Sequence, residues 1–143
     1  MIWFLRHGDA EDGSGDDAAR RLTRKGERQA GNAGLALAAL GVNLDACLAS
    51  PRVRATETAR LACEPLGLEV EIAPELSGGD FDPPALVAGR GDVLLVGHEP
   101  DFSSAVAGLT GARVQMKKGG LAAVEGRQLV TLLRPAQIER IAS

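Results

Sequence analysis

Two stretches of the chain consist of apolar residues without interruption, and each one ends abruptly in polar residues. The first runs from Met1 to Leu5, and the second, VLLVG, from Val93 to Gly97. A strand with one face in water alternates apolar and polar side chains, whereas a continuous apolar run indicates that both faces are buried. The two stretches are therefore predicted to be central strands of a sheet that is covered on both sides.

Longer amphipathic stretches separate these strands from four further ones. The other strands are predicted at residues 45–49, 69–72, 121–124 and 128–133, the last two as an antiparallel hairpin, and helices within 23–41, 50–65, 84–89 and 101–109. Strands that alternate with helices are typical of a mainly parallel sheet with helices on both faces. The predicted fold class is therefore α/β, a three-layer α/β/α sandwich. The length of 143 residues favours a single domain, residues 1–143.

Capping residues set the expected limits of the two longest helices. Thr23 suits the N-cap of the first helix, and Gly41 suits its end. Ser50 suits the N-cap of the second helix, with Pro51 at the first helical position, and Pro65 stops it. Both helices are thus predicted to begin directly after a hydroxyl-bearing residue.

Composition narrows the classes of function. Hydrophobic residues make up 45% of the chain but aromatic ones only 3%, which predicts a core of aliphatic side chains. A formal net charge of −3 argues against nucleic-acid binding, which needs a basic surface. No charged segment followed by a long apolar run opens the sequence, so neither a signal peptide nor a membrane span is expected, and the predicted location is the cytoplasm. Cys47 and Cys63 are expected to be small core residues without a disulfide.

Polar residues follow three of the predicted strands. Arg6 and His7 end the first strand, His98 follows the strand that ends at Gly97, and residues 50–54 follow another. In open parallel sheets, ligands bind outside the carboxyl ends of the strands. The chain has only these two histidines. A lone histidine is usually structural, but two at equivalent strand ends, each beside a glycine, favour a shared site.

The residue types at these strand ends favour phosphoryl chemistry over a metal site. Two histidines without a carboxylate make a poor metal site, and neighbouring arginines would repel a dication, so neither a metal nor another cofactor is expected. The guanidinium group of arginine matches phosphate with two hydrogen bonds, and the helix after Ser50 adds backbone donors at its N-terminus. Arg52 and Arg54 are two apart on that helix and point to nearly opposite faces, so only one of them is expected in the crevice.

His7 could act as a nucleophile in such a pocket. A neutral imidazole with a free nitrogen can attack phosphorus and form a covalent phosphohistidine. Nearby arginines lower the pKa of an imidazole and so favour the neutral form. Gly8 lets the backbone approach the phosphoryl group, because it has no side chain. His98 and the arginines would stabilise charge on the phosphoryl oxygens.

Three motifs carry a resemblance to a known family. LRHG at residues 5–8, SPRVRATETA at 50–59 and VGHEP at 96–100 together resemble the histidine phosphatase superfamily. Within it, the short chain, the opening RHGDAE and the segment LTRKGERQA at 22–30 look most like the SixA-type phosphohistidine phosphatases. The resemblance covers nearly the whole chain, and it implies a phosphoglycerate mutase-like fold.

The resemblance also implies roles for individual residues. It makes His7 the nucleophile, and the residues that complete the phosphate pocket are Arg6, Arg54 and His98, with Arg52 left at the surface or rim. Family members that act on phosphate esters carry a carboxylate that protonates the leaving group, and Glu75 in PELSGGD at 74–80 is the nearest match. Asp9 is a second candidate acid, with a loop-orienting role as the alternative.

The substrate class is the least constrained part of the prediction. Only residues 9–21 and 74–92 could wall the pocket, so an open crevice is expected, which favours phosphohistidine on a partner protein such as a phosphotransfer protein of signal transduction. An imidazole leaving group can already carry a proton on its other nitrogen, and such a substrate would tolerate a poorly placed acid.

Two other functions stay open at this point. One is a phosphatase for small phosphate esters or anhydrides, and the other is a non-catalytic phosphate-binding module. A mutase is disfavoured because it needs a closed pocket that excludes water. The acidic residues between Asp9 and Asp17 could repel small polyanions or form an ordinary solvated loop. Lys117 and Lys118 could supply a positive rim or be ordinary surface lysines.

Overall fold

A six-stranded sheet forms the centre of the protein in the computed structural model, which describes residues 1–13 and 15–143. The strands lie in the order β3-β2-β4-β1-β5-β6. They are β1 (Ile2–Arg6), β2 (Ala46–Ala49), β3 (Val70–Ile72), β4 (Val93–Gly97), β5 (Leu121–Glu125) and β6 (Gln128–Leu133). The first four are parallel to one another, and β5 and β6 are antiparallel. The mainly parallel sheet and the terminal hairpin are therefore confirmed.

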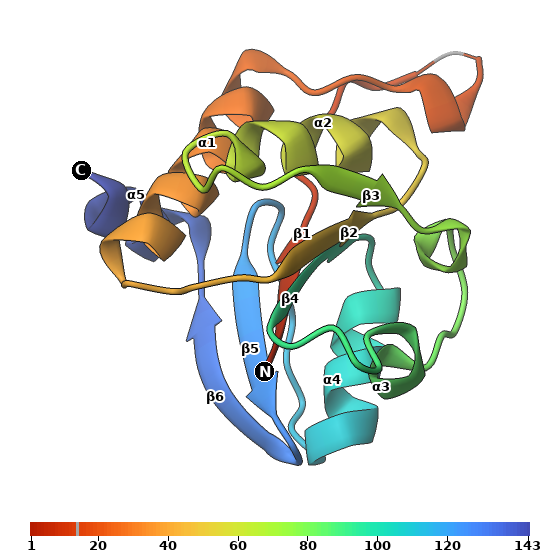
Figure 1. Cartoon of the computed structure of the whole chain (residues 1–143). Coiled ribbons are helices and arrows are strands. Elements are labelled where there is room, and N and C mark those ends of the chain that lie inside the picture. Colours follow the sequence, from red (N-terminus) through yellow and green to blue (C-terminus); the bar gives the residue numbers. More distant parts are fainter. Residues whose placement is uncertain (14) are drawn as a thin grey trace.

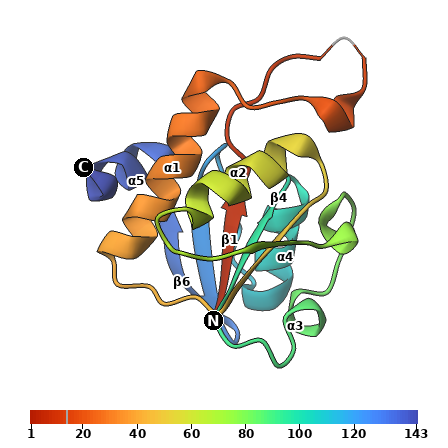
Figure 2. The same ribbon diagram turned by 45° about the horizontal axis from the view of Figure 1, so that its top comes forward.

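Helices cover both faces of the sheet, as Figures 1 and 2 show. The helices are α1 (Arg24–Ala39), α2 (Val53–Cys63), α3 (Pro83–Leu86), α4 (Asp101–Thr110) and α5 (Pro135–Ala142), with short 3₁₀ turns η1 (Asp17–Ala19) and η2 (Pro74–Leu76). Side chains of α1, α2 and α5 pack on one face of the sheet. Side chains of α4 and of the segment around η2 and α3 pack on the other face. The predicted three-layer sandwich is confirmed.

The two uninterrupted apolar runs occupy the positions that their composition predicted. β4 lies between β2 and β1 in the middle of the sheet. On β1, Trp3 and Leu5 face the α1–α2–α5 layer, whereas Phe4 faces the α4 layer. All five residues of β4 are buried. Burial on both faces explains why neither strand alternates in polarity.

Small residues let α1 and α2 pack closely in a core that has few aromatic side chains. Ala33, Ala36, Ala55, Ala59 and Ala62 are all completely buried. A Cβ added at Gly34 would lie 2.1 Å from the carbonyl oxygen of Ala62, so only glycine fits at this crossing. Both cysteines are buried free thiols in the same layer, as expected.

The start of α1 follows the prediction, but the start of α2 does not. The hydroxyl oxygen of Thr23 accepts the N–H of Gly26 at 3.0 Å, which makes Thr23 the N-cap of α1. α2 begins three residues after Ser50, and its N-cap is Arg52, without a side-chain cap. The N-cap prediction for Ser50 is wrong because its backbone N–H still extends the sheet, donating to the carbonyl of Val96 at 3.0 Å.

α5 is the one helix that the sequence analysis did not predict. It begins at Pro135, and the side chain of Gln137 accepts the N–H of Arg134 at 2.8 Å. Ile138 is its only fully buried residue, so its apolar pattern is short. In the part of the chain that the structure describes, no helix is long and apolar enough to cross a membrane.

Candidate active site

The carboxyl ends of β1, β2 and β4 bring the predicted site residues together. The N–H of His7 donates to the carbonyl of Gly97 at 3.0 Å, so β1 and β4 end side by side. The rings of His7 and His98 lie with their centroids 5.3 Å apart, and both side chains are buried. Arg54, from the first turn of α2, donates from Nε to Nε2 of His7 at 3.3 Å. The two histidines therefore share one site with Arg54.

The hydrogen bonds of His7 leave Nε2 as its unprotonated nitrogen. Nδ1 lies 2.7 Å from the carbonyl oxygen of Gly8. A carbonyl only accepts, so Nδ1 carries the proton of the neutral ring. Burial, more than the nearby charges of Arg54 and Arg6, lowers the pKa of His7 to about 4. The ring is therefore neutral at pH 7, with the lone pair on Nε2. The neutral form was predicted, but burial of the ring contributes more to it than the arginines that were expected to cause it.

Gly8 is held in place by its neighbours on α1 and α2. Its N–H donates to the hydroxyl oxygen of Thr58 at 3.0 Å, and that hydroxyl donates to the carbonyl of Arg54 at 2.7 Å. A Cβ at Gly8 would lie 2.6 Å from the carbonyl oxygen of Gly26. The missing side chain thus makes room for α1. Contact of Gly8 with a phosphoryl group stays a prediction.

Arg52 and Arg54 both reach the loop that follows β1, but of the two only Arg54 also forms a hydrogen bond with His7 among the described residues. Nη1 of Arg52 lies 2.6 Å from Oδ2 of Asp17, and Nη2 of Arg54 lies 3.3 Å from the same oxygen. Nη1 of Arg54 also donates to the carbonyl of Asp17 at 3.0 Å. The side chain of Arg54 is buried, whereas that of Arg52 is about one-third exposed and lies at the rim. Arg52 is the N-cap, so helical geometry does not set its direction.

Asp17 is a site residue that the sequence analysis missed. Its carboxylate also pairs with Arg20 at 2.9 Å, so it contacts three guanidinium groups. The charge of Arg54, above all, lowers the pKa of Asp17. The carboxylate of Asp17 therefore occupies a position where N–H groups of the three arginines can bind an anionic group. Nothing in an acidic, glycine-containing loop distinguishes this aspartate from its neighbours.

Arg6 and His98 each keep a buried nitrogen without a partner. Arg6 donates from Nη1 to the carbonyl of Met116 at 3.0 Å, while its Nε has no partner within the described part of the chain. Nε2 of His98 lies 2.7 Å from the hydroxyl of Ser50, and Nδ1 is left without a partner there. Burial, followed by the charges of His7 and Arg54, lowers the pKa of His98 to about 3. Both side chains can therefore donate to a bound anion.

The two candidate acids form no hydrogen bond with the imidazole of His7 among the described residues. Glu75 is exposed in η2 and lines a pocket of about 480 Å³ with Pro74 and Phe81. No hydrogen bond or ion pair among the described residues joins it to the histidines. Asp9 accepts the hydroxyl of Thr23 at 2.8 Å, which lowers the pKa of Asp9 and keeps it ionised. These contacts fit the loop-orienting role better than that of an acid.

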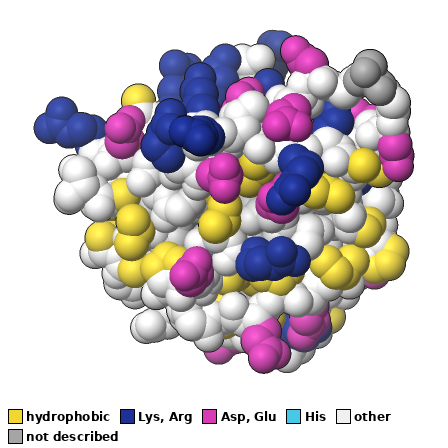
Figure 3. Space-filling view, turned by 90° about the horizontal axis from the view of Figure 1, so that it is seen from above, with side chains coloured by type: hydrophobic (Ala, Val, Ile, Leu, Met, Phe, Trp, Pro, Cys, Tyr) yellow, Lys and Arg dark blue, Asp and Glu magenta, His cyan; other side chains and the backbone are white. Residues whose placement is uncertain are grey.

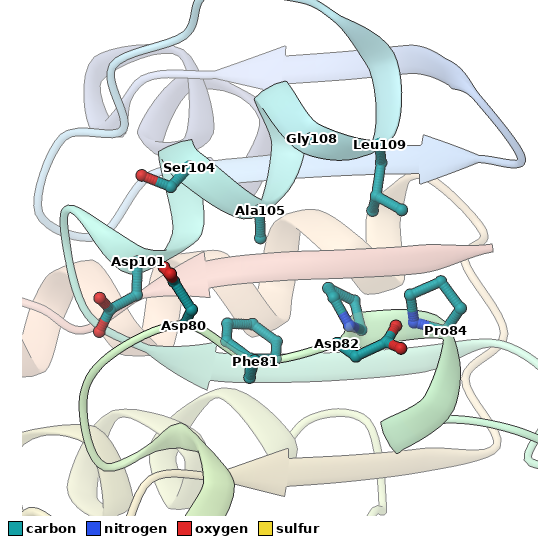
Figure 4. A pocket seen from close by; sticks show the side chains of 10 residues that line it. Asp80, Phe81, Asp82, Pro84, Asp101, Ser104, Ala105, Gly108 and Leu109 are labelled. Carbon is teal, nitrogen blue, oxygen red and sulfur yellow. The ribbon is translucent and has the colours of Figure 1, made fainter.

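The carboxylates of Asp80 and Asp101 lie together beside the start of α4 (Figure 4), and we call them the acidic wall. A pocket of about 410 Å³ lies between residues 80–84 and α4, and none of the predicted site residues lines it. Figure 4 shows the carboxylates of Asp80 and Asp101 at one end of this pocket and Leu109 at the other. Burial, and then the charge of Asp80, raises the pKa of Asp101. Arg52 lies between this wall and the site, because its charge acts on Asp101 while its Nη1 pairs with Asp17 at 2.6 Å.

The described residues offer no obvious metal centre. Within residues 1–13 and 15–143, no group of three or more histidine, cysteine, aspartate or glutamate side chains could hold a metal ion. The site is instead rich in N–H donors from arginine and histidine. Such a site can bind a phosphoryl group and attack it with Nε2 of His7.

Comparison with known proteins agrees with this chemistry. Residues 2–83 match the model of the family described as "Histidine phosphatase superfamily (branch 1)". A "Phosphohistidine phosphatase SixA homolog" of Haemophilus influenzae is 35% identical over 128 residues, which cover 78% of each chain. The structure of "the protein histidine phosphatase SixA complexed with tungstate" superposes with a TM-score of 0.83 at 25% identity, covering 94% of this chain and 97% of that one. A putative alpha-ribazole-5'-P phosphatase of Escherichia coli superposes with a TM-score of 0.75 at 22% identity, covering 95% and 98%, and so shows the fold alone.

Proposed function

The chain belongs to the histidine phosphatase superfamily, and we propose that it hydrolyses phosphohistidine on a partner protein through a covalent intermediate on His7. The observation that carries this proposal is the state of the His7 ring. Nδ1 donates to the carbonyl of Gly8, the pKa of about 4 keeps the ring neutral, and the lone pair of the unprotonated Nε2 is oriented by the N–H that it accepts from Nε of Arg54. A buried, neutral, oriented imidazole is the form that attacks phosphorus.

The proposed reaction has two displacements at phosphorus. In the first, Nε2 of His7 attacks, the bond between phosphorus and the substrate imidazole breaks, and that imidazole leaves with the electron pair of the broken bond. In the second, water attacks the phosphoryl group on His7, the phosphorus–nitrogen bond breaks with its electron pair returning to Nε2, and inorganic phosphate leaves while the proton lost by the water passes to the phosphate or to solvent. Arg6, Arg54 and His98 stabilise the oxygens in both steps by donating hydrogen bonds.

The contacts of the candidate acids support phosphohistidine as the substrate. A phosphate ester releases an alkoxide, which needs a proton in the transition state. Glu75 is exposed in η2, and Asp9 is held ionised by Thr23 and Lys118. An imidazole that leaves already protonated on its other nitrogen does not need that acid. The named SixA relatives favour the same substrate, and tungstate is, like phosphate, a tetrahedral oxyanion.

Small phosphate esters or anhydrides are the second candidate substrates. The acidic-walled pocket beside α4 favours this alternative, because it could hold the leaving group of a small molecule. A non-catalytic phosphate-binding module would not need the oriented Nε2. A cytoplasmic location and a place in signal transduction stay predictions of the sequence.

The test is a paired turnover assay without added metal. One substrate is a phosphotransfer domain phosphorylated on histidine, and the other is an aryl phosphate, each assayed with wild type and His7→Ala. We expect turnover of the domain, loss of it in the variant, and an acid-labile, base-stable phosphoryl group on the wild-type protein after rapid quenching. Preference for the aryl phosphate, together with loss of activity in Glu75→Gln, would favour the small-ester function. If neither substrate is turned over and no phosphoryl group is found on the protein, the non-catalytic phosphate-binding module would be favoured.

A further inference from the structure

Exposed cations line one side of the site, opposite the acidic wall. Lys25 and Arg28 of α1 form a cleft of about 300 Å³ with Pro135 and Glu139 of α5. Lys117 and Lys118 lie just before β5 and are exposed. We call Arg24, Lys25, Arg28, Lys117 and Lys118 the basic face. Figure 3, which looks down on the end of the sheet where the site lies, shows lysine and arginine side chains gathered on one side of it.

The basic face is continuous with the nucleophile. The N–H of Gly119 lies 3.1 Å from the carbonyl oxygens of both Arg6 and His7. A Cβ at Gly119 would lie 2.8 Å from Cβ of Gln29, so the 117–119 loop packs directly on α1. Lys118 reaches Asp9 at 3.3 Å, one residue after the glycine that follows His7. The 117–119 loop therefore connects the end of β1 at His7 with the cleft-lining part of α1.

Most charges of the basic face form no ion pair within residues 1–13 and 15–143. Among the described residues, only Lys118 of the five forms an ion pair. Glu139 is the one acidic side chain that lines the cleft. The chain as a whole carries a formal charge of −3, so this surface is opposite in sign to the rest of the molecule. Its charge is therefore available to an anionic partner.

The extent of the surface points to a macromolecule. From Lys25 to Asn32, the cleft-lining part of α1 spans about 10 Å along the helix axis. A small molecule with its phosphoryl group at His7 would not also fill a cleft on the far side of the 117–119 loop. A folded protein that presents phosphohistidine to His7 would cover both places at once.

We propose that the basic face docks an acidic surface of the phosphorylated partner protein, beside its phosphohistidine. This inference rests on the proposed function and adds the chemistry of the partner. The exposed cations attract the acidic surface before contact and raise the association rate. The acidic wall on the α4 side disfavours the reverse orientation, because like charges would then meet.

A charge-reversal experiment with two substrates tests the proposal. The variant Lys25→Glu/Arg28→Glu is compared with Arg113→Glu/Arg127→Glu, which makes the same change in net charge away from the site. Arg127 follows the end of β5 that pairs with the start of β1, and Arg113 follows the end of α4. The probes are an acidic phosphotransfer domain phosphorylated on histidine and free phosphohistidine. The same assays are repeated at 0.05 M and 0.5 M salt.

We expect the first variant to lower kcat/KM on the domain about tenfold or more and to leave kcat/KM on free phosphohistidine within about twofold. The control variant should keep both values. High salt should slow the wild type on the domain and hardly affect the first variant, because screening removes attraction between exposed charges.

Three results would overturn the docking surface. These are unchanged turnover of the domain, an equal loss in the control variant, and an equal loss on free phosphohistidine. In each of them wild type still turns over free phosphohistidine, so the proposed function survives. Failure of wild type on both probes would overturn the proposed function and the docking surface together.

Discussion

The hydroxyl oxygen of Ser50 lies 2.7 Å from Nε2 of His98, and both side chains are buried. Ser50 Oγ accepts the N–H of Arg52 at 3.2 Å, and among the described residues Nε2 of His98 is the one acceptor that its hydroxyl proton reaches, so we assign Ser50 as the donor to Nε2. Nε2 then carries no hydrogen, and the neutral imidazole holds its proton on Nδ1. That nitrogen has no partner in the described part of the protein. Nδ1 is therefore the donor that His98 offers to a phosphoryl oxygen.

Replacing Ser50 by Ala should lower kcat without a matching rise in KM. Without the hydroxyl, Nε2 can take the proton, and the lone pair of Nδ1 then faces the phosphoryl oxygens. Loss of one oriented donor typically costs about 10²–10³-fold in rate, and because only the tautomer is affected we expect roughly ten- to hundredfold. The ¹⁵N shifts of His98 should report the change of tautomer. The matched control is Ser104→Ala, an exposed serine on α4, and equal kcat values for the two variants would contradict the role of Ser50.

Removing the carboxylate of Asp17 should tighten the binding of inorganic phosphate. In the structure this carboxylate contacts Arg20, Arg52 and Arg54, and an incoming phosphate would compete with it. Because Asp17 is more than half exposed, the effect should be modest, about three- to tenfold in the Kd of phosphate. Titration calorimetry of Asp17→Ala against Asp12→Ala measures it. Weaker phosphate binding in Asp17→Ala would instead make Asp17 a residue that positions Arg54.

Two glycines of α1 should respond in opposite ways to substitution by alanine. A Cβ at Gly26 would lie 2.0 Å from the carbonyl oxygen of Asp9, whereas a Cβ at Gly31 meets nothing within 4 Å. Gly31→Ala should raise the free energy of unfolding by about 0.5–1 kcal/mol, because alanine favours a helix over glycine. Gly26→Ala should lower it by about 1–3 kcal/mol, because the backbone after Gly8 must shift. Urea unfolding of the two variants checks both signs. A higher free energy of unfolding in both variants would show that the backbone after Gly8 accommodates the added Cβ without destabilising the protein.

Most of the fold could be predicted because strand and helix patterns are local. Burial on both faces makes β1 and β4 continuous apolar runs, and Thr23 caps α1 within its own sequence. The start of α2 could not be predicted in this way. The residue that resembles a cap, Ser50, is bound by Val96 and His98 from a neighbouring strand, and that contact is not local. α5 was missed because only one of its residues is fully buried.

In the candidate site, too, the features that depend on local patterns could be predicted and those that depend on long-range contacts could not. The shared crevice of His7 and His98 follows from their positions at strand ends, since parallel strands end at the same edge of a sheet. The roles of Asp17 and Ser50 depend on contacts across 37 and 48 residues of the chain, and no periodicity reports such contacts. The pKa of His7 likewise depends on burial by the whole fold, which is larger than the effect of its neighbours in sequence.

Acid should destabilise the protein through its two histidines. The pKa is about 4 for His7 and about 3 for His98, against about 6.5 in an unfolded chain. Between pH 6.5 and 4 the unfolded state therefore binds more protons than the folded state, so the free energy of unfolding falls as the pH falls through this window. The expected slope approaches 1.4 kcal/mol per pH unit for each histidine, to order of magnitude. Urea unfolding between pH 7 and pH 4.5 measures this slope. In His7→Asn the part of the slope that His7 causes should be lost. The carboxylates contribute equally to the slope in both proteins, so the difference between them reports His7 alone. Because the untagged chain has only two histidines, an NMR titration of the two rings provides a direct check, and a midpoint near 6.5 for either ring would contradict its buried, neutral state.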